Sequence, residues 1–70
     1  MVSGPRARSE LAALYLRAAN TLDQSAQLAQ QHAQRERNNG RLHSADLELE
    51  RAGRARAGAE RGRALAAQMR

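Results

Sequence analysis

Apolar residues recur every three or four positions along the first half of the chain. Within residues 5–38 they are Ala7, Leu11, Leu14, Tyr15, Ala18, Leu22, Ala26, Ala29 and Ala33. At about 100° per residue these positions form one stripe of a helix whose opposite face is polar. The pattern predicts a long amphipathic helix over about residues 5–38. The 4, 3, 4 spacing from Leu11 to Leu22 repeats to Ala33, and this period favours nearly straight packing or a slight right-handed coil.

The sequence "NNG" at residues 38–40 ends this pattern. Gly40 suits the left-handed position that follows the C-terminus of many helices. Ser44 is the expected N-cap of a second helix, over about residues 44–68. A short connection at residues 39–41 between two helical segments predicts an αα-hairpin. The expected fold is therefore all-α, a single antiparallel two-helix domain over residues 1–70.

Small residues dominate the second helical segment. Its expected inner face comprises Leu42, Leu49, Gly53, Ala57, Ala64 and Ala67. A hairpin that turns at Asn39 pairs positions whose numbers add up to about 79, which sets Leu22 beside Ala57 and Tyr15 beside Ala64. Large side chains on one arm would then meet small ones on the other, as close packing requires.

A second interpretation of residues 51–67 is a solvated basic tail. Its glycines at positions 53, 58 and 62 each cost about 1 kcal/mol relative to alanine in a helix interior. A free tail would have no reason to match the first helix in side-chain size, so we favour the packed arm. Fraying is expected after about Arg61.

Composition limits what this hairpin can be. The 70 residues include no cysteine, no tryptophan and no phenylalanine, and more than half of the apolar residues are alanine. A chain of this length rarely gains more than ~3 to 5 kcal/mol from a single core. No apolar run is long enough for a signal peptide or a membrane anchor, so we expect a cytoplasmic protein without membrane contact.

Several leucines lie at the margins of the expected inner stripes or outside them. The candidate interaction surface they form comprises Leu14, Leu28, Leu47 and Leu65. Two long helices rarely hold together alone, so these leucines favour a homodimer that forms a four-helix bundle, or docking onto a partner. The alternative is that they are scattered surface leucines, which are common in proteins.

The net charge of +5 is unevenly distributed. Residues 51–70 carry +5 and residues 41–50 carry −2, so a hairpin would have a basic open end. The candidate polyanion-binding residues are Arg51, Arg54, Arg56, Arg61, Arg63, Arg6 and Arg8. Such a surface suits phosphates or an acidic protein partner. The alternative is a solvated face with helical ion pairs such as Glu50 with Arg54 and Glu60 with Arg63.

No catalytic motif is visible. His32 and His43 flank the turn near Glu36 and Asp46, but four side chains would have to converge at a flexible turn, so we expect no metal site and no cofactor. A two-helix rod has no room for a concave apolar site, and we expect no enzymatic activity. The expected function is a self-associating protein–protein interaction module. The alternative is a nucleic-acid-binding accessory protein that uses the arginine-rich open end.

Overall fold

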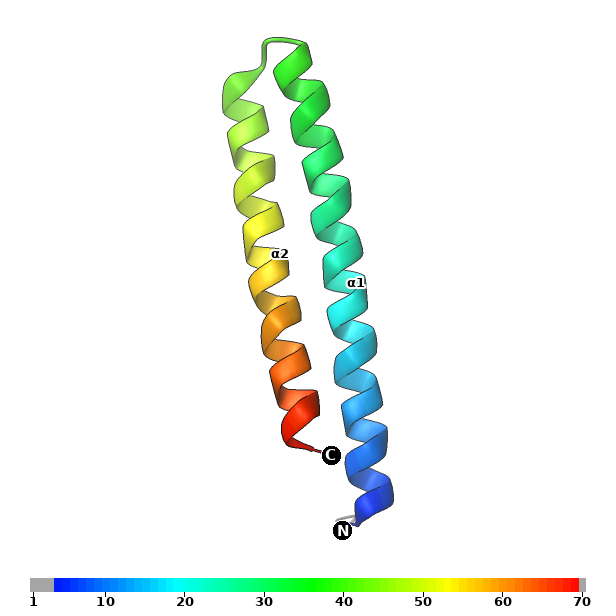
Figure 1. The fold of residues 1–70 in the computed structure, drawn as a ribbon. Coiled ribbons are helices and arrows are strands. Elements are labelled where there is room, and N and C mark those ends of the chain that lie inside the picture. Colours follow the sequence, from blue (N-terminus) through cyan, green and yellow to red (C-terminus); the bar gives the residue numbers. More distant parts are fainter. Residues whose placement is uncertain (1–3, 70) are drawn as a thin grey trace.

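Two helices run side by side in opposite directions and are joined by one tight turn (Figure 1). The computed structural model describes residues 4–69; residues 1–3 and 70, which the predicted domain includes, lie outside the described residues. Helix α1 spans Pro5–Asn38 and helix α2 spans Leu42–Gln68. Together they form a rod with extents of 54 × 17 × 12 Å. The predicted all-helical hairpin is confirmed.

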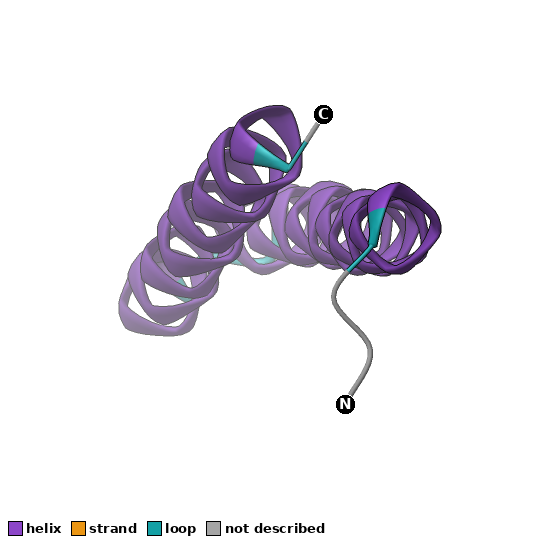
Figure 2. Ribbon diagram, turned by 90° about the horizontal axis from the view of Figure 1, so that it is seen from below, coloured by secondary structure: helices purple, strands orange, loops and turns teal. Residues whose placement is uncertain are grey.

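The helix bounds differ from the predicted ones only in α2. Helix α1 begins and ends where the periodicity places it. Helix α2 begins two residues before Ser44 and continues past Arg61 to Gln68, the end that the sequence predicts. Seen along the rod, the first turn of α1 and the last turn of α2 lie on the near side, at the open end of the hairpin (Figure 2).

Two backbone hydrogen bonds, donated by Gly40 and Arg41, close the C-terminus of α1. Its φ of +77° is left-handed, and its N–H donates to the carbonyl oxygen of Arg37 at 3.0 Å. The N–H of Arg41 donates to the carbonyl oxygen of Glu36 at 2.8 Å. This pair of bonds is a Schellman motif, so the predicted role of Gly40 is confirmed.

The predicted N-cap of α2 is wrong. Arg41 occupies the N-cap position with no side-chain capping bond, and its carbonyl oxygen accepts the first helical hydrogen bond from the N–H of Ala45, at 3.0 Å. Because the Schellman motif already fixes the backbone of Arg41, the chain enters α2 at once. Ser44 therefore lies inside the first turn.

Alanines spaced seven residues apart hold the two helices together. We call these residues the alanine seam; no member is more than 5% exposed, and they are Ala12, Ala19, Ala26 and Ala33 on α1 with Ala45, Ala52, Ala59 and Ala66 on α2. Ala29 is also buried. A seven-residue repeat is typical of a coiled coil with a left-handed supercoil. The eleven-residue period predicted for α1 is therefore wrong.

Many residues of the seam are shifted by one position in the sequence from the residues that were predicted to face inward. On α1, Ala26, Ala29 and Ala33 are buried as predicted, but Leu11 and Ala18 are exposed. On α2 the whole predicted face is exposed, namely Leu42, Leu49, Gly53, Ala57, Ala64 and Ala67. Alanine between the helix axes allows a closer approach than leucine, so the small residues take the inside and the leucines face outward.

Two glycines of α2 lie where α1 approaches closely, one beside the Leu22 side chain and one beside the α1 backbone. A Cβ atom at Gly58 would lie 3.0 Å from Cδ1 of Leu22. One at Gly62 would lie 3.2 Å from the backbone oxygen of Tyr15. The predicted matching of large with small residues is thus present, but Leu22 faces Gly58 rather than Ala57.

We expect the glycines of α2 to respond differently to a single added methyl group. A Cβ at Gly53 has no atom within 4 Å, so Gly53→Ala gains helix propensity and should raise Tm by about 2 to 8 °C. At Gly62 the methyl group presses on the α1 backbone, which cannot rotate away, so Gly62→Ala should lower Tm. Thermal unfolding followed by circular dichroism at equal protein concentration measures both, and an equal rise in Tm would contradict the close approach at Gly62.

Candidate interaction surface

The leucines predicted to form an interaction surface are all exposed. Leu14, Leu28 and Leu47 each keep half or more of their surface accessible, and Leu65 keeps 39%. They belong to both helices, two on each. Whether they form one surface depends on which side of the hairpin each occupies.

A groove at the turn end of the rod identifies one side of the hairpin. It encloses about 410 Å³ and is lined by His32 and Glu36 of α1 and by Ser44, Leu47, Glu48 and Arg51 of α2. Because residues from both helices line it, the groove lies along the line where the helices meet. Leu47 is thereby placed on the same side as His32.

The seven-residue repeat gives the side of the hairpin on which the other leucines lie, because residues seven apart occupy the same side of a coiled-coil helix. Leu28 precedes His32 by four residues, one helical turn, and Leu14 precedes Leu28 by two repeats. Leu65 follows Arg51 by two repeats. All four predicted leucines therefore lie on the groove side.

Leu11 belongs to the same surface. It precedes His32 by three repeats and is 46% exposed. The sequence analysis missed it because the predicted stripe placed it inside the hairpin. We call this surface the leucine face, comprising Leu11, Leu14, Leu28, Leu47 and Leu65.

The opposite side of the hairpin is marked by a polar bridge between the helices. Arg63 of α2 donates to a carboxylate oxygen of Asp23 and, at 3.2 Å, to Oδ1 of Asn20. Leu42 and Leu49 lie three and two repeats before Arg63, so they share its side. These two exposed leucines are separate from the leucine face.

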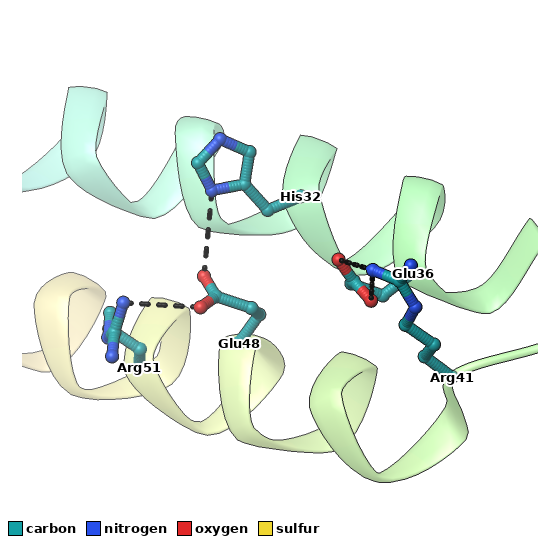
Figure 3. Close-up of polar contacts among 5 residues, drawn as sticks. All are labelled: His32, Glu36, Arg41, Glu48 and Arg51. Carbon is teal, nitrogen blue, oxygen red and sulfur yellow. Dashed lines mark hydrogen bonds and ion pairs between the residues drawn. The ribbon is translucent and has the colours of Figure 1, made fainter. Parts of the chain in front are cut away.

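Acidic side chains interrupt the apolar contact at the turn end (Figure 3). Glu36 accepts hydrogen bonds from Nη1 of Arg41 at 3.3 and 3.4 Å. Glu48 accepts one from Nη1 of Arg51 at 3.2 Å. Both carboxylates are largely buried, with side-chain exposures of 26% and 19%. An arginine from the turn and one from α2 thus neutralise charges near the seam.

One oxygen of Glu48 has no hydrogen-bond donor in the described residues. Its Oε2 atom is buried, and Nδ1 of His32 lies 3.9 Å away, too far for a hydrogen bond. A buried acceptor without a donor costs about 1 to 3 kcal/mol. We therefore expect Glu48 to make the turn end of the hairpin less stable than an alanine there would.

The structure does not bring the candidate metal ligands together. His32 and Glu36 line the groove, whereas His43 and Asp46 are exposed and do not. Within residues 4–69 no three His, Cys, Asp or Glu side chains are close enough to hold a metal ion.

Three of the candidate polyanion-binding arginines contact acidic side chains. Arg6 pairs with Glu10 at 3.6 Å, Arg51 with Glu48, and Arg63 with Asp23. The other candidates make no ion pair with the described part of the chain; they are Arg8, Arg54, Arg56 and Arg61. The helical pairs considered as the alternative, Glu50 with Arg54 and Glu60 with Arg63, do not form there either.

Positive charge is less concentrated at the open end than predicted. Arg51 lines the groove at the turn end, and Arg54 and Arg56 follow it towards the middle of the rod. Residues 22–58, the half that carries the turn, contain six arginines and five acidic residues. Residues 4–21 and 59–69 contain five arginines and two acidic residues. The open half is the more positive, by two charges.

Comparisons of the chain with known protein families, curated proteins and solved structures find no match. In the part of the chain that the structure describes, neither helix combines the length and apolar character needed to cross a membrane.

Glu48→Ala should stabilise the protein. The change removes a buried oxygen without a donor and extends the run of alanines at the helix contact, and replacing buried ionic groups by apolar ones is often stabilising. We expect Tm to rise by several degrees in thermal unfolding, while Glu50→Ala, at an exposed position of the same helix, leaves it nearly unchanged. A clear fall in Tm for Glu48→Ala would mean that its contacts with Arg51 and His32 hold the turn end together.

Proposed function

We propose that this chain is a non-enzymatic interaction module that self-associates through the leucine face and forms a four-helix bundle. The observation that supports the proposal is the placement of its exposed leucines. Five of them, from both helices, lie on one side of a hairpin whose buried core consists of alanine.

Energetics favour burial of the leucine face. A buried methyl group contributes about 0.8 kcal/mol, whereas a fully buried leucine side chain contributes about 1.5 to 3 kcal/mol. No side chain larger than alanine is fully buried within the described hairpin. Covering several leucines therefore adds more apolar stabilisation than several alanines of the seam supply.

The shape of the rod supports the same proposal. The chain exposes 5401 Å², whereas a compact protein of this mass exposes roughly 4300 Å². Its radius of gyration is 16.2 Å, against roughly 11 Å for a compact domain of this length. Stacking a second hairpin on one side would make the assembly thicker and reduce the surface exposed per chain.

A second candidate function rests on the unpaired arginines of α2. Arg54, Arg56 and Arg61 have no acidic partner in the described residues, so their guanidinium groups are available to phosphates. Nucleic-acid binding of this kind would weaken steeply with salt, with a log–log slope of about 0.9 for each duplex phosphate contacted.

The double variant Leu47→Glu with Leu65→Glu should remain helical but become monomeric. Both positions lie on the leucine face, and burying four glutamates in a dimer would be unfavourable. The matched control is Leu42→Glu with Leu49→Glu, which places two glutamates on the opposite side of the same helix and should leave the dimer intact. Sedimentation equilibrium gives the mass, and circular dichroism gives the helix content.

Sedimentation also separates the two candidate functions. A dimer that persists at low and high salt and ignores an added DNA duplex supports the leucine-face proposal. A monomer at all concentrations that binds the duplex only at low salt would contradict it and favour the arginine surface. Dissociation of the control dimer but not of the Leu47 and Leu65 variant would show that the other side of the hairpin is the interface.

A further inference from the structure

The leucines of the leucine face form two groups along the rod. Leu11, Leu14 and Leu65 lie towards the open end, and Leu28 and Leu47 lie towards the turn. Between the groups the same side carries the small residues Ala18, Ser25 and Gly58, which lie at repeat positions of His32 and Arg51. It also carries Arg54 and Arg61, which lie one and two repeats after Leu47. Two apolar groups separated by small and basic residues make a surface that can match its own inverted copy.

We propose that the leucine face is covered by a second copy of this chain in antiparallel orientation, with the turn of each copy against the open end of the other. The proposal rests on the proposed self-association and adds the orientation of the two copies. Each open-end leucine group would then pack on the turn-end group of the second copy.

A single two-fold axis can relate both pairs of groups. The midpoint between Leu14 and Leu28 on α1 is Thr21, and the midpoint between Leu47 and Leu65 on α2 is Arg56. Leu22 faces Gly58, so these midpoints differ in level by about two or three residues, roughly 3 to 5 Å. That offset is less than one helical turn.

The same axis gives nearly complete overlap of the two rods. Thr21 is the middle residue of α1, within Pro5–Asn38, and Arg56 is one residue from the middle of α2, within Leu42–Gln68. An antiparallel pair centred at this level therefore covers each hairpin along almost its whole length. The small residues Ala18 and Gly58 lie near the axis, where they allow the copies to approach closely.

The groove at the turn end fits this arrangement. Rotation about the axis places Leu65 of the second copy over Leu47, which lines the groove, and Leu14 of the second copy over Leu28. Projecting leucines at one end of each copy thus meet a hollow at the other end. A self-complementary surface of this kind is what a two-fold dimer requires.

Charge distinguishes the antiparallel from the parallel orientation. A parallel pair would also bring leucines to leucines, but it would stack the two open halves, each of which has five arginines and two acidic residues. An antiparallel pair places each open half, with a net charge of +3 (five arginines less two acids), against a turn half with a net charge of only +1 (six arginines less five acids). Like charges repel across an interface, so the antiparallel pair is favoured.

Distances between spin labels on the full chain test the orientation. The protein has no cysteine, so Asn39→Cys introduces one unique attachment site at the turn. In an antiparallel dimer the two labels lie at opposite ends of a rod 54 Å long, and double electron–electron resonance should give a distance close to that length. In a parallel dimer the labels would lie within roughly 20 Å of each other.

Cross-linking gives an independent measurement at the axis. Thr21→Cys should form a disulfide-linked dimer readily under mild oxidation, because the axis brings the two copies of residue 21 together. The matched control Gln24→Cys, on the outward side of α1, should cross-link far more slowly.

The measurements test both the orientation of the two copies and their self-association. A long distance between labels at residue 39 with efficient cross-linking at residue 21 supports the antiparallel dimer. A short distance at residue 39 overturns the orientation and leaves self-association intact. If the labelled and unlabelled proteins are monomeric by sedimentation, both the orientation and the proposed function fail.

Discussion

The close approach of two helices along a line of alanines is the constraint on which the rest of this structure depends. Eight alanines at seven-residue intervals, four on each helix, are buried between the helices. The side chain of Leu22 packs beside Gly58, and the backbone of Tyr15 lies beside Gly62, because neither glycine has a side chain at those points. Any larger residue in the seam would have to push the two helix axes apart.

The same constraint determines what the outside of the hairpin looks like. Because alanines take the inner positions, seven leucines are displaced outward and are substantially exposed, whereas Leu16 and Leu22 are half-buried. Five of the seven lie on the groove side, and Leu42 and Leu49 lie on the other. The proposed self-association and its antiparallel orientation both follow from that asymmetry, together with the unequal charge of the two halves of the rod.

The helices and the turn could be predicted from sequence because their signals are local. Periodicity gave the bounds of α1, and a glycine after two asparagines gave the left-handed residue at position 40. The seam of α2 could not be predicted, because small residues occupy so many positions between Ala52 and Ala67 that shifted faces look equally apolar. Only packing against α1 selects Ala52 and Ala59 over Ala57.

The candidate surface was predicted in part for a related reason. Leu28, Leu47 and Leu65 fall outside the inner stripe in either register and Leu14 lies at its margin, so their exposure does not depend on which alanines are buried. Leu11 does depend on it, because a shift of one residue exchanges it with Ala12. Glu48 gave no sequence signal of burial, since a glutamate beside a helix contact resembles any surface acid until the partner helix is in place.

The alanine seam is tested most directly by comparing Ala52→Leu with Ala57→Leu in thermal unfolding at equal concentration. Ala52 is buried against Ala26 and Ala29, so leucine there overpacks the seam at a cost of about 1 to 3 kcal/mol. We predict a fall in Tm of about 4 °C or more for Ala52→Leu and almost no change for Ala57→Leu, whose side chain is exposed. If Ala57→Leu is the more damaging substitution, the helices pack through the other face of α2 and the seam described here is wrong.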